Sequence, residues 1–85
     1  MTYEVYLHPE VVKFLKKLPK EDVERIKAKL YELKNPHFVK SVKIKGGKAF
    51  RVRVGDYRII YTLDEDRKVI VVFKIDRRER AYDRL

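Results

Sequence analysis

Residues 50–61 read FRVRVGDYRIIY, and this stretch decides the expected fold because two alternating runs flank a short turn. An alternation with a period of two predicts strands, and Gly55-Asp56 suits a two-residue hairpin turn. That turn sets the following pairs: Val54 with Tyr57, Arg53 with Arg58, and Val52 with Ile59. Because directly opposite residues point to the same side of a sheet, we expect Arg53 and Arg58 side by side, with Arg51 on the same face.

The residues before this hairpin continue the alternation. Val42 and Ile44 alternate with lysines, and Gly46-Gly47 marks a second turn. A two-residue loop would place Val42 on the charged face opposite Arg51, whereas a three-residue loop avoids this conflict. The expected pairs are therefore Lys43 with Arg51 and Ile44 with Phe50. The expected basic outer face then consists of Lys43, Lys45, Arg51, Arg53 and Arg58. We expect this face to bind an anion such as a phosphate group of RNA, because the planar fork of arginine donates two hydrogen bonds at once.

The remaining residues predict two helices and two more strands. Residues 2–7 alternate as a strand, and Pro9 suits the first position of a helix that ends at Pro19. A second amphipathic helix follows and ends at Asn35-Pro36. Residues 68–75 are apolar at nearly every position, so we expect a strand buried on both faces. The sequence predicts one α+β domain over residues 1–85. In it an antiparallel helical hairpin packs on a mostly antiparallel sheet of four to five strands.

Composition indicates a polyanionic partner. The 85 residues carry a formal net charge of +9. Residues 42–58 contribute six basic and one acidic side chains, which is more than half of the excess. A nucleic acid or an acidic protein would match this charge, although the same side chains also suit a solvated basic surface. There is no cysteine, no long apolar run and no signal-like start, so we expect a cytoplasmic protein without a membrane span.

Several kinds of catalytic site are disfavoured by the residues present. His8 and His37 are isolated, and Ser41 is the only serine, which argues against a metal pair and a Ser-His-Asp hydrolase. Gly46-Gly47 lacks the pattern of a phosphate-binding loop. We expect no cofactor. Arginine, lysine and tyrosine remain, and such residues can cleave RNA without a metal because the RNA itself supplies a 2′-hydroxyl nucleophile.

The sequence resembles the RelE/ParE toxin superfamily, and more specifically its archaeal RelE branch. The resemblance covers nearly the whole chain. It rests on LHPEVVKFLKKLP at residues 7–19, on FRVRVGDYRIIY at residues 50–61 and on KIDRRERAYDRL at residues 74–85. It implies a small sheet with an N-terminal helical hairpin, and a toxin that cuts messenger RNA in the ribosomal A site.

The resemblance also implies roles for individual residues. Three residues match the family's basic sheet residues, namely Arg51, Arg53 and Arg58. Of these, Arg58 is also an expected catalytic residue, together with two residues near the end of the sequence. Arg78 matches the arginine that stabilises the transition state. Tyr82 matches the tyrosine that stacks on a base or assists proton transfer. The implied partners are an acidic antitoxin protein, the ribosome with its 16S RNA surface, and messenger RNA.

This chain departs from its relatives at several positions. Some relatives carry lysine where this chain has Arg51 and Arg53, and arginine stays protonated, so neither can serve as a general base. Relatives with a Glu-His arrangement have histidine where this chain has Arg77. Tyr82 is then the expected proton acceptor. Two other functions share the fold: a ParE-like inhibitor of DNA gyrase, and a non-catalytic RNA-binding or co-repressor relative.

Overall fold

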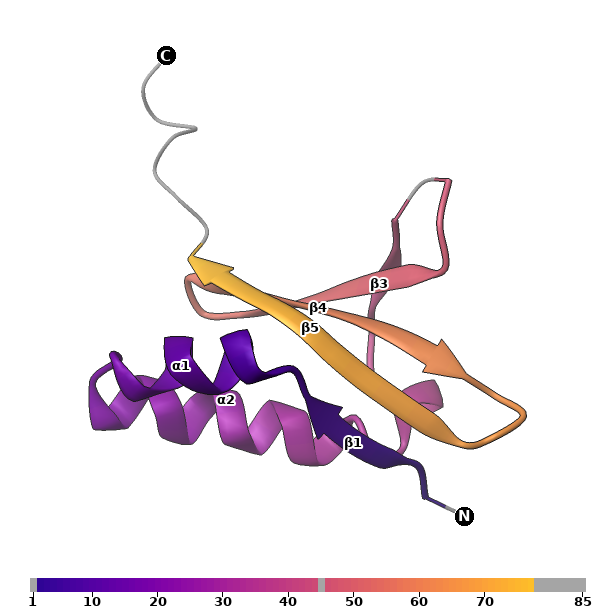
Figure 1. Ribbon diagram of the computed structural model, residues 1–85, viewed down its shortest axis with the longest axis horizontal. Coiled ribbons are helices and arrows are strands. Elements are labelled where there is room, and N and C mark those ends of the chain that lie inside the picture. The colour runs from indigo at the N-terminus through magenta and orange to yellow at the C-terminus, as the bar shows by residue number, and fades with distance from the viewer. Residues whose placement is uncertain (1, 45, 78–85) are drawn as a thin grey trace.

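The computed structural model describes residues 2–44 and 46–77. Two helices lie on one face of a five-stranded sheet, which confirms the predicted α+β class (Figure 1). The helices are α1 (Pro9–Lys16) and α2 (Lys20–Glu32), followed by a single 3-10 turn, η1 (Pro36–Phe38). The strands are β1 (Glu4–Leu7), β2 (Val42–Lys43), β3 (Ala49–Val54), β4 (Tyr57–Asp64) and β5 (Val69–Arg77).

The helical hairpin begins and ends where local chemistry predicts. His8 caps α1 through its Nδ1, which accepts a hydrogen bond of 3.0 Å from the backbone N–H of Glu10. Pro9 occupies the first helical turn, where its missing N–H costs nothing. Pro19 separates the helices, and Glu21 and Asp22 lie in the first turn of α2, where acidic side chains oppose the positive end of the helix dipole.

The sheet has the strand order β1-β5-β4-β3-β2. β1 runs parallel to β5, and all other neighbours are antiparallel. The core lies between the sheet and the helices. Its buried members are Tyr3, Val11, Ile26, Leu30, Leu33, Val52, Val54, Tyr57, Ile59, Tyr61, Ile70, Val72 and Ile75.

The predicted burial of both faces of β5 is wrong. Ile70, Val72 and Ile75 are buried against the helices, whereas Val71 and Phe73 are 36% and 39% exposed on the other side. β5 has one parallel and one antiparallel neighbour, so it is not part of an all-parallel sheet covered on both faces. Both helices of the described chain lie on the same face of the sheet, which leaves the other side of β5 exposed. In the part of the chain that the structure describes, no helix covers the outer face of the sheet.

A β-bulge interrupts the pairing of β4 with β5. Tyr61 lies opposite Val72, but the preceding residue, Ile60, lies opposite Lys74, so Phe73 is the extra residue. After this shift Ile75 returns to the core and Asp76 lies opposite Arg58. An extra residue in one strand reverses the alternation beyond it. The bulge therefore determines which side chains of β5 share a face with Arg58.

The predicted register of β2 is also wrong. Val42 lies opposite Arg51 and Lys43 lies opposite Phe50, which is the pairing that the sequence argument rejected. The predicted register requires a buried side for Val42, but this two-residue strand is exposed on both sides, and Val42 is 54% exposed. Without burial there is no energetic reason to keep Val42 from the charged side.

Candidate nucleic-acid interface

Three arginines lie on the outer face of the sheet near the β3–β4 turn. Arg51 and Arg53 belong to β3 and Arg58 belongs to β4. Their neighbours Val52 and Val54 are buried on the opposite side, so the alternation directs the arginines outward. Arg53 lies opposite Arg58, as predicted. We refer to Arg51, Arg53 and Arg58 as the arginine face.

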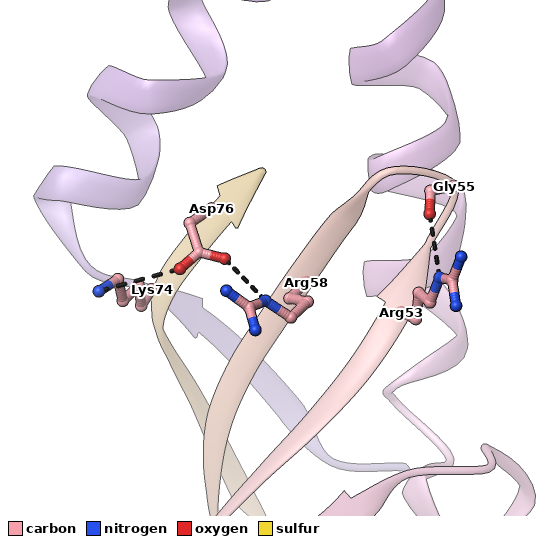
Figure 2. Close-up of polar contacts among 5 residues, drawn as sticks. All are labelled: Arg53, Gly55, Arg58, Lys74 and Asp76. Carbon is pink, nitrogen blue, oxygen red and sulfur yellow. Dashed lines mark hydrogen bonds and ion pairs between the residues drawn. The ribbon is translucent and has the colours of Figure 1, made fainter. Parts of the chain in front are cut away.

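Directly opposed arginines repel each other, and the fold offsets this at Arg58. Its Nε donates a hydrogen bond of 3.2 Å to Oδ1 of Asp76 on β5 (Figure 2). The second carboxylate oxygen of Asp76 lies 3.9 Å from Nζ of Lys74. Arg53 turns the other way, and its Nε donates to the carbonyl oxygen of Gly55 at 3.3 Å. The two guanidinium groups are thus held by different partners.

The rows of the sheet arrange these charges in a compact patch. Arg53, Arg58 and Asp76 lie opposite one another across β3, β4 and β5, and Arg51, Ile60 and Lys74 form the next row. Four cations and one carboxylate leave a formal excess of three positive charges. A guanidinium group presents several N–H donors in a plane, which suits the oxygens of a phosphate. The patch is therefore a candidate site for a polyanion.

The structure does not bring all predicted site residues together. Lys43 pairs with Phe50 and so lies on the opposite side of the sheet from the arginine face, which corrects its predicted place. Its predicted position depended on the wrong register of β2. Lys45, Arg78 and Tyr82 lie outside the described residues, and their roles stay predictions.

Two residues of this patch were missed by the sequence argument, namely Lys74 and Asp76. Residues 68–75 are apolar at nearly every position and were predicted to form a strand buried on both faces, so Lys74 was given no role, and Asp76 lies beyond the predicted strand. The sequence carries no signal for the bulge, because residues 69–73 and Ile75 are all apolar, and only the burial of Val72 and Ile75 in the structure reveals the step of three.

Tyr57 connects this end of the sheet to the helical hairpin. Its hydroxyl donates a hydrogen bond of 2.7 Å to Oδ2 of Asp22 in α2, and its ring packs edge-on against Phe14 of α1. The guanidinium carbon of Arg77 lies 5.7 Å from the centre of the same ring. The hydrogen bond to Asp22, together with burial, raises the pKa of Tyr57 above its usual 10.0. The strands that carry Arg58 and Asp76 are therefore anchored to both helices.

A groove of about 260 Å³ lies between α1 and β5, next to the patch. Lys13, Lys17 and Lys74 line it, together with Phe14 and Phe73. This volume suits one or two side chains rather than a cofactor. Glu10 also lines the groove and its Oε2 lies 3.7 Å from Lys13 Nζ, so the lining has three lysines, one carboxylate and two aromatic rings and is basic on balance.

The described residues offer little for metal binding or membrane insertion. Within residues 2–44 and 46–77, no three acidic or histidine side chains lie close enough to hold a metal ion. His37 Nε2 lies 3.8 Å from Glu65 Oε2, as a pair without a third ligand in the part of the chain that the structure describes. Neither described helix is both long and apolar enough to cross a membrane.

Comparisons with known proteins support a toxin family. The family described as ParE toxin of type II toxin-antitoxin system, parDE, matches residues 5–82. A Methanocaldococcus jannaschii protein named as toxin RelE1 is 34% identical over 87 residues, which cover 96% of this chain and 97% of that protein.

Solved structures agree with this relationship. The chain is 34% identical to a chain in an archaeal RelE–RelB complex from Pyrococcus horikoshii, with a TM-score of 0.78 and coverage of 94% of this chain and 99% of that one. The isolated E. coli RelE toxin is 22% identical, with a TM-score of 0.80 and coverage of 95% and 92%, and this likeness concerns the fold. The chain therefore belongs to the ParE toxin family of type II toxin–antitoxin systems, and within the RelE/ParE superfamily it is a RelE-like toxin.

Proposed function

We propose that this toxin is a ribosome-dependent endoribonuclease that cleaves messenger RNA in the A site and so inhibits translation in the cytoplasm. The observation that carries the proposal is the arginine face, where Arg51, Arg53 and Arg58 share one exposed side of the sheet. Three guanidinium groups on one face can each donate paired hydrogen bonds to phosphate oxygens of a nucleic-acid backbone. The likeness to RelE toxins supports RNA as the polyanion.

The proposed reaction needs no metal. The 2′-hydroxyl of the RNA attacks the adjacent phosphorus, and the bond from that phosphorus to the 5′-oxygen of the next nucleotide breaks. Charge builds up on the phosphate oxygens, where arginine side chains stabilise it. Arg58 and Arg78 are the proposed catalytic arginines, and Arg51 and Arg53 hold neighbouring phosphates.

Proton transfer is assigned to Tyr82. The 2′-hydroxyl must lose a proton as it attacks, and the leaving oxygen must gain one. A tyrosine hydroxyl has an unperturbed pKa of about 10, so it accepts a proton poorly near neutral pH. Because a nearby cation favours the phenolate, this role requires cations beside the tyrosine hydroxyl when RNA is bound. We therefore expect a slow enzyme in which the ribosome holds the RNA in line for attack.

The test is to map cuts in a defined messenger on stalled ribosomes. The wild-type toxin should cut within the A-site codon, and Arg78→Ala and Arg58→Ala should abolish or greatly reduce cutting while both proteins remain folded. Arg67→Ala is the matched control, because Arg67 is 81% exposed in the turn at the other end of β4. Full cutting by both site variants would refute the assigned roles.

The same assay separates two other functions. The match to a family described as ParE toxin favours a ParE-like inhibitor of DNA gyrase as the second candidate. Inhibition of DNA supercoiling by a folded protein that cuts no messenger would select it. Binding of RNA without cleavage and without gyrase inhibition would instead indicate a non-catalytic RNA-binding or co-repressor relative.

An acidic antitoxin is the proposed protein partner. Relatives from Pyrococcus horikoshii and Methanococcus jannaschii have been solved as RelE–RelB complexes. We propose that an acidic antitoxin segment lies over the arginine face or along the helical hairpin, where it would bury a large surface as it folds. Reversing Arg53 or Arg58 to Glu should weaken the complex in a titration. An unaltered affinity would place the contact elsewhere.

A further inference from the structure

Asp76 is the carboxylate that the fold places beside the arginine face. It accepts a hydrogen bond of 3.2 Å from Arg58 Nε, and both side chains are about one third exposed, at 30% and 32%. Asp76 reaches this position through the bulge at Phe73, because without that shift Arg58 would lie opposite Ile75. A negative charge next to a phosphate-binding site repels the phosphate, so its presence there calls for a physical reason.

The geometry of the bond supplies this reason. Asp76 engages Arg58 through Nε (Figure 2). Within residues 2–44 and 46–77, neither terminal nitrogen of Arg58 donates a hydrogen bond. The terminal nitrogens carry four of the five guanidinium N–H donors. A bond at Nε restricts the rotation of the long side chain and leaves the terminal donors available to a ligand. This restriction lowers the entropy cost of forming a later contact.

The charges around Asp76 also limit its repulsion of a phosphate. Lys74 Nζ lies 3.9 Å from the second oxygen of Asp76, so the carboxylate has a cation on each side. Arg53, directly opposite Arg58, donates to the carbonyl of Gly55, and no acid of residues 2–44 and 46–77 pairs with it. Asp76 thus separates the two like charges by drawing Arg58 toward β5 (Figure 2).

We propose that Asp76 is a positioning residue, which fixes the Arg58 side chain through Nε so that its terminal donors bind an RNA phosphate. The inference rests on the proposed function of the arginine face. The change in RNA affinity that it predicts for Asp76→Ala is opposite in sign to the change expected from net charge alone. Removing Asp76 adds one positive charge and should by charge alone tighten RNA binding, whereas loss of positioning removes the contribution of Arg58.

A double-mutant cycle tests this with a labelled short single-stranded RNA and the free toxin at fixed salt. In the wild-type background Arg58→Ala should weaken RNA binding about tenfold or more, as expected for one charge-assisted hydrogen bond. In the Asp76→Ala background the same change should weaken binding less than about threefold. Asp76→Asn keeps an acceptor oxygen and should restore most of the effect of Arg58→Ala.

The control is Asp66→Ala, which removes one negative charge from the exposed turn between β4 and β5. In that background Arg58→Ala should keep its full effect. The Tm of Asp76→Ala should fall by less than about 5 °C, since a partly exposed ion pair contributes little to stability. Exchange of the Arg58 Nε proton with solvent, followed by NMR, should accelerate in Asp76→Ala.

Three results would overturn the inference, and only one of them would also refute the RNA site. Equal effects of Arg58→Ala in the wild-type and Asp76→Ala backgrounds, or an unchanged exchange rate of the Nε proton, would refute positioning while leaving the arginine face as an RNA site. No effect of Arg58→Ala on RNA binding in the wild-type background would refute the RNA site itself, and the positioning role with it.

Discussion

The hydrogen bond from Tyr57 to Asp22 should contribute measurably to stability, and Tyr57→Phe isolates it. The substitution removes one hydroxyl and keeps the ring that packs against Phe14 and under Arg77. The bond is 2.7 Å long and joins a strand to a helix. Since Tyr57 is 4% exposed, the hydroxyl gains little from water in the folded protein.

The expected cost follows from these features. A hydrogen bond to a charged group contributes roughly 1.5–3 kcal/mol. Asp22 is only partly buried, so its carboxylate can regain water when the hydroxyl is lost, which favours the lower end of the range. We expect Tyr57→Phe to lower the free energy of unfolding by about 1.5–2 kcal/mol. For a domain of this size that corresponds to a fall in Tm of roughly 6–16 °C.

Urea unfolding of four proteins measures this contribution: wild type, Tyr57→Phe, Asp22→Ala and the double variant. Asp22→Ala should cost an additional ~0.3–1 kcal/mol, because Asp22 also lies in the first turn of α2. In that background Tyr57→Phe should cost less than about 0.5 kcal/mol. Tyr31→Phe is the matched control, since Tyr31 is 71% exposed. A full cost for Tyr57→Phe in the Asp22→Ala background would show that the hydroxyl does not stabilise the fold through Asp22.

Three further predictions concern pH, the outer face and the hairpin turn. The raised pKa of Tyr57 means that the folded state holds the hydroxyl proton more tightly than the unfolded chain. This contribution to stability is therefore complete below pH 10.0 and is lost as the pH rises through the folded pKa. In urea unfolding between roughly pH 8 and 11, the free energy of unfolding should fall less steeply with pH in Tyr57→Phe than in the wild type, and an equal slope would contradict the assignment. Ile75→Ala should lower the free energy of unfolding by about 2–5 kcal/mol and Phe73→Ala by about 1 kcal/mol or less, because Ile75 is 4% and Phe73 is 39% exposed. Equal losses in chemical denaturation would contradict the burial of β5 on one face only. Gly55 has a φ of +57°, so Gly55→Ala should lower the free energy of unfolding by about 1–2 kcal/mol. Gly55→Asn should lower it less, because asparagine tolerates this conformation better. A lower Tm for Gly55→Asn than for Gly55→Ala in thermal unfolding would argue against a left-handed turn.

The hairpin at residues 50–61 was predictable to the level of individual pairs. A two-residue turn fixes the phase of both strands, and one of the two faces must be buried, so only one register satisfies both conditions. The opposed arginines at 53 and 58 follow from that register. The helical hairpin was predictable for a similar reason, since Pro9 and Pro19 mark local boundaries that do not depend on distant contacts.

The predictions that failed depended on the surroundings of a segment. The register of β2 was wrong because Val42 is not buried and so carries no information about the pairing. The prediction that both faces of β5 are buried was wrong because an apolar run does not tell how many faces of the sheet the helices cover. The pairing of Asp76 with Arg58 depends on both the strand order and the bulge at Phe73, neither of which the composition of β5 specifies.

The position of β5 in the sheet limits how much of the fold can form while the chain is being translated. Of the described strands, β5 is synthesised last, yet it lies between β1 and β4 in the sheet. Glu4 on β1 pairs with Val69 on β5, so β1 has no sheet neighbour until most of the chain has been translated. At roughly 5–20 residues per second the intervening residues take several seconds to synthesise. A nascent chain that stops before β5 has neither a closed core nor Asp76 beside Arg58, so a truncated translation product would lack the assembled arginine face.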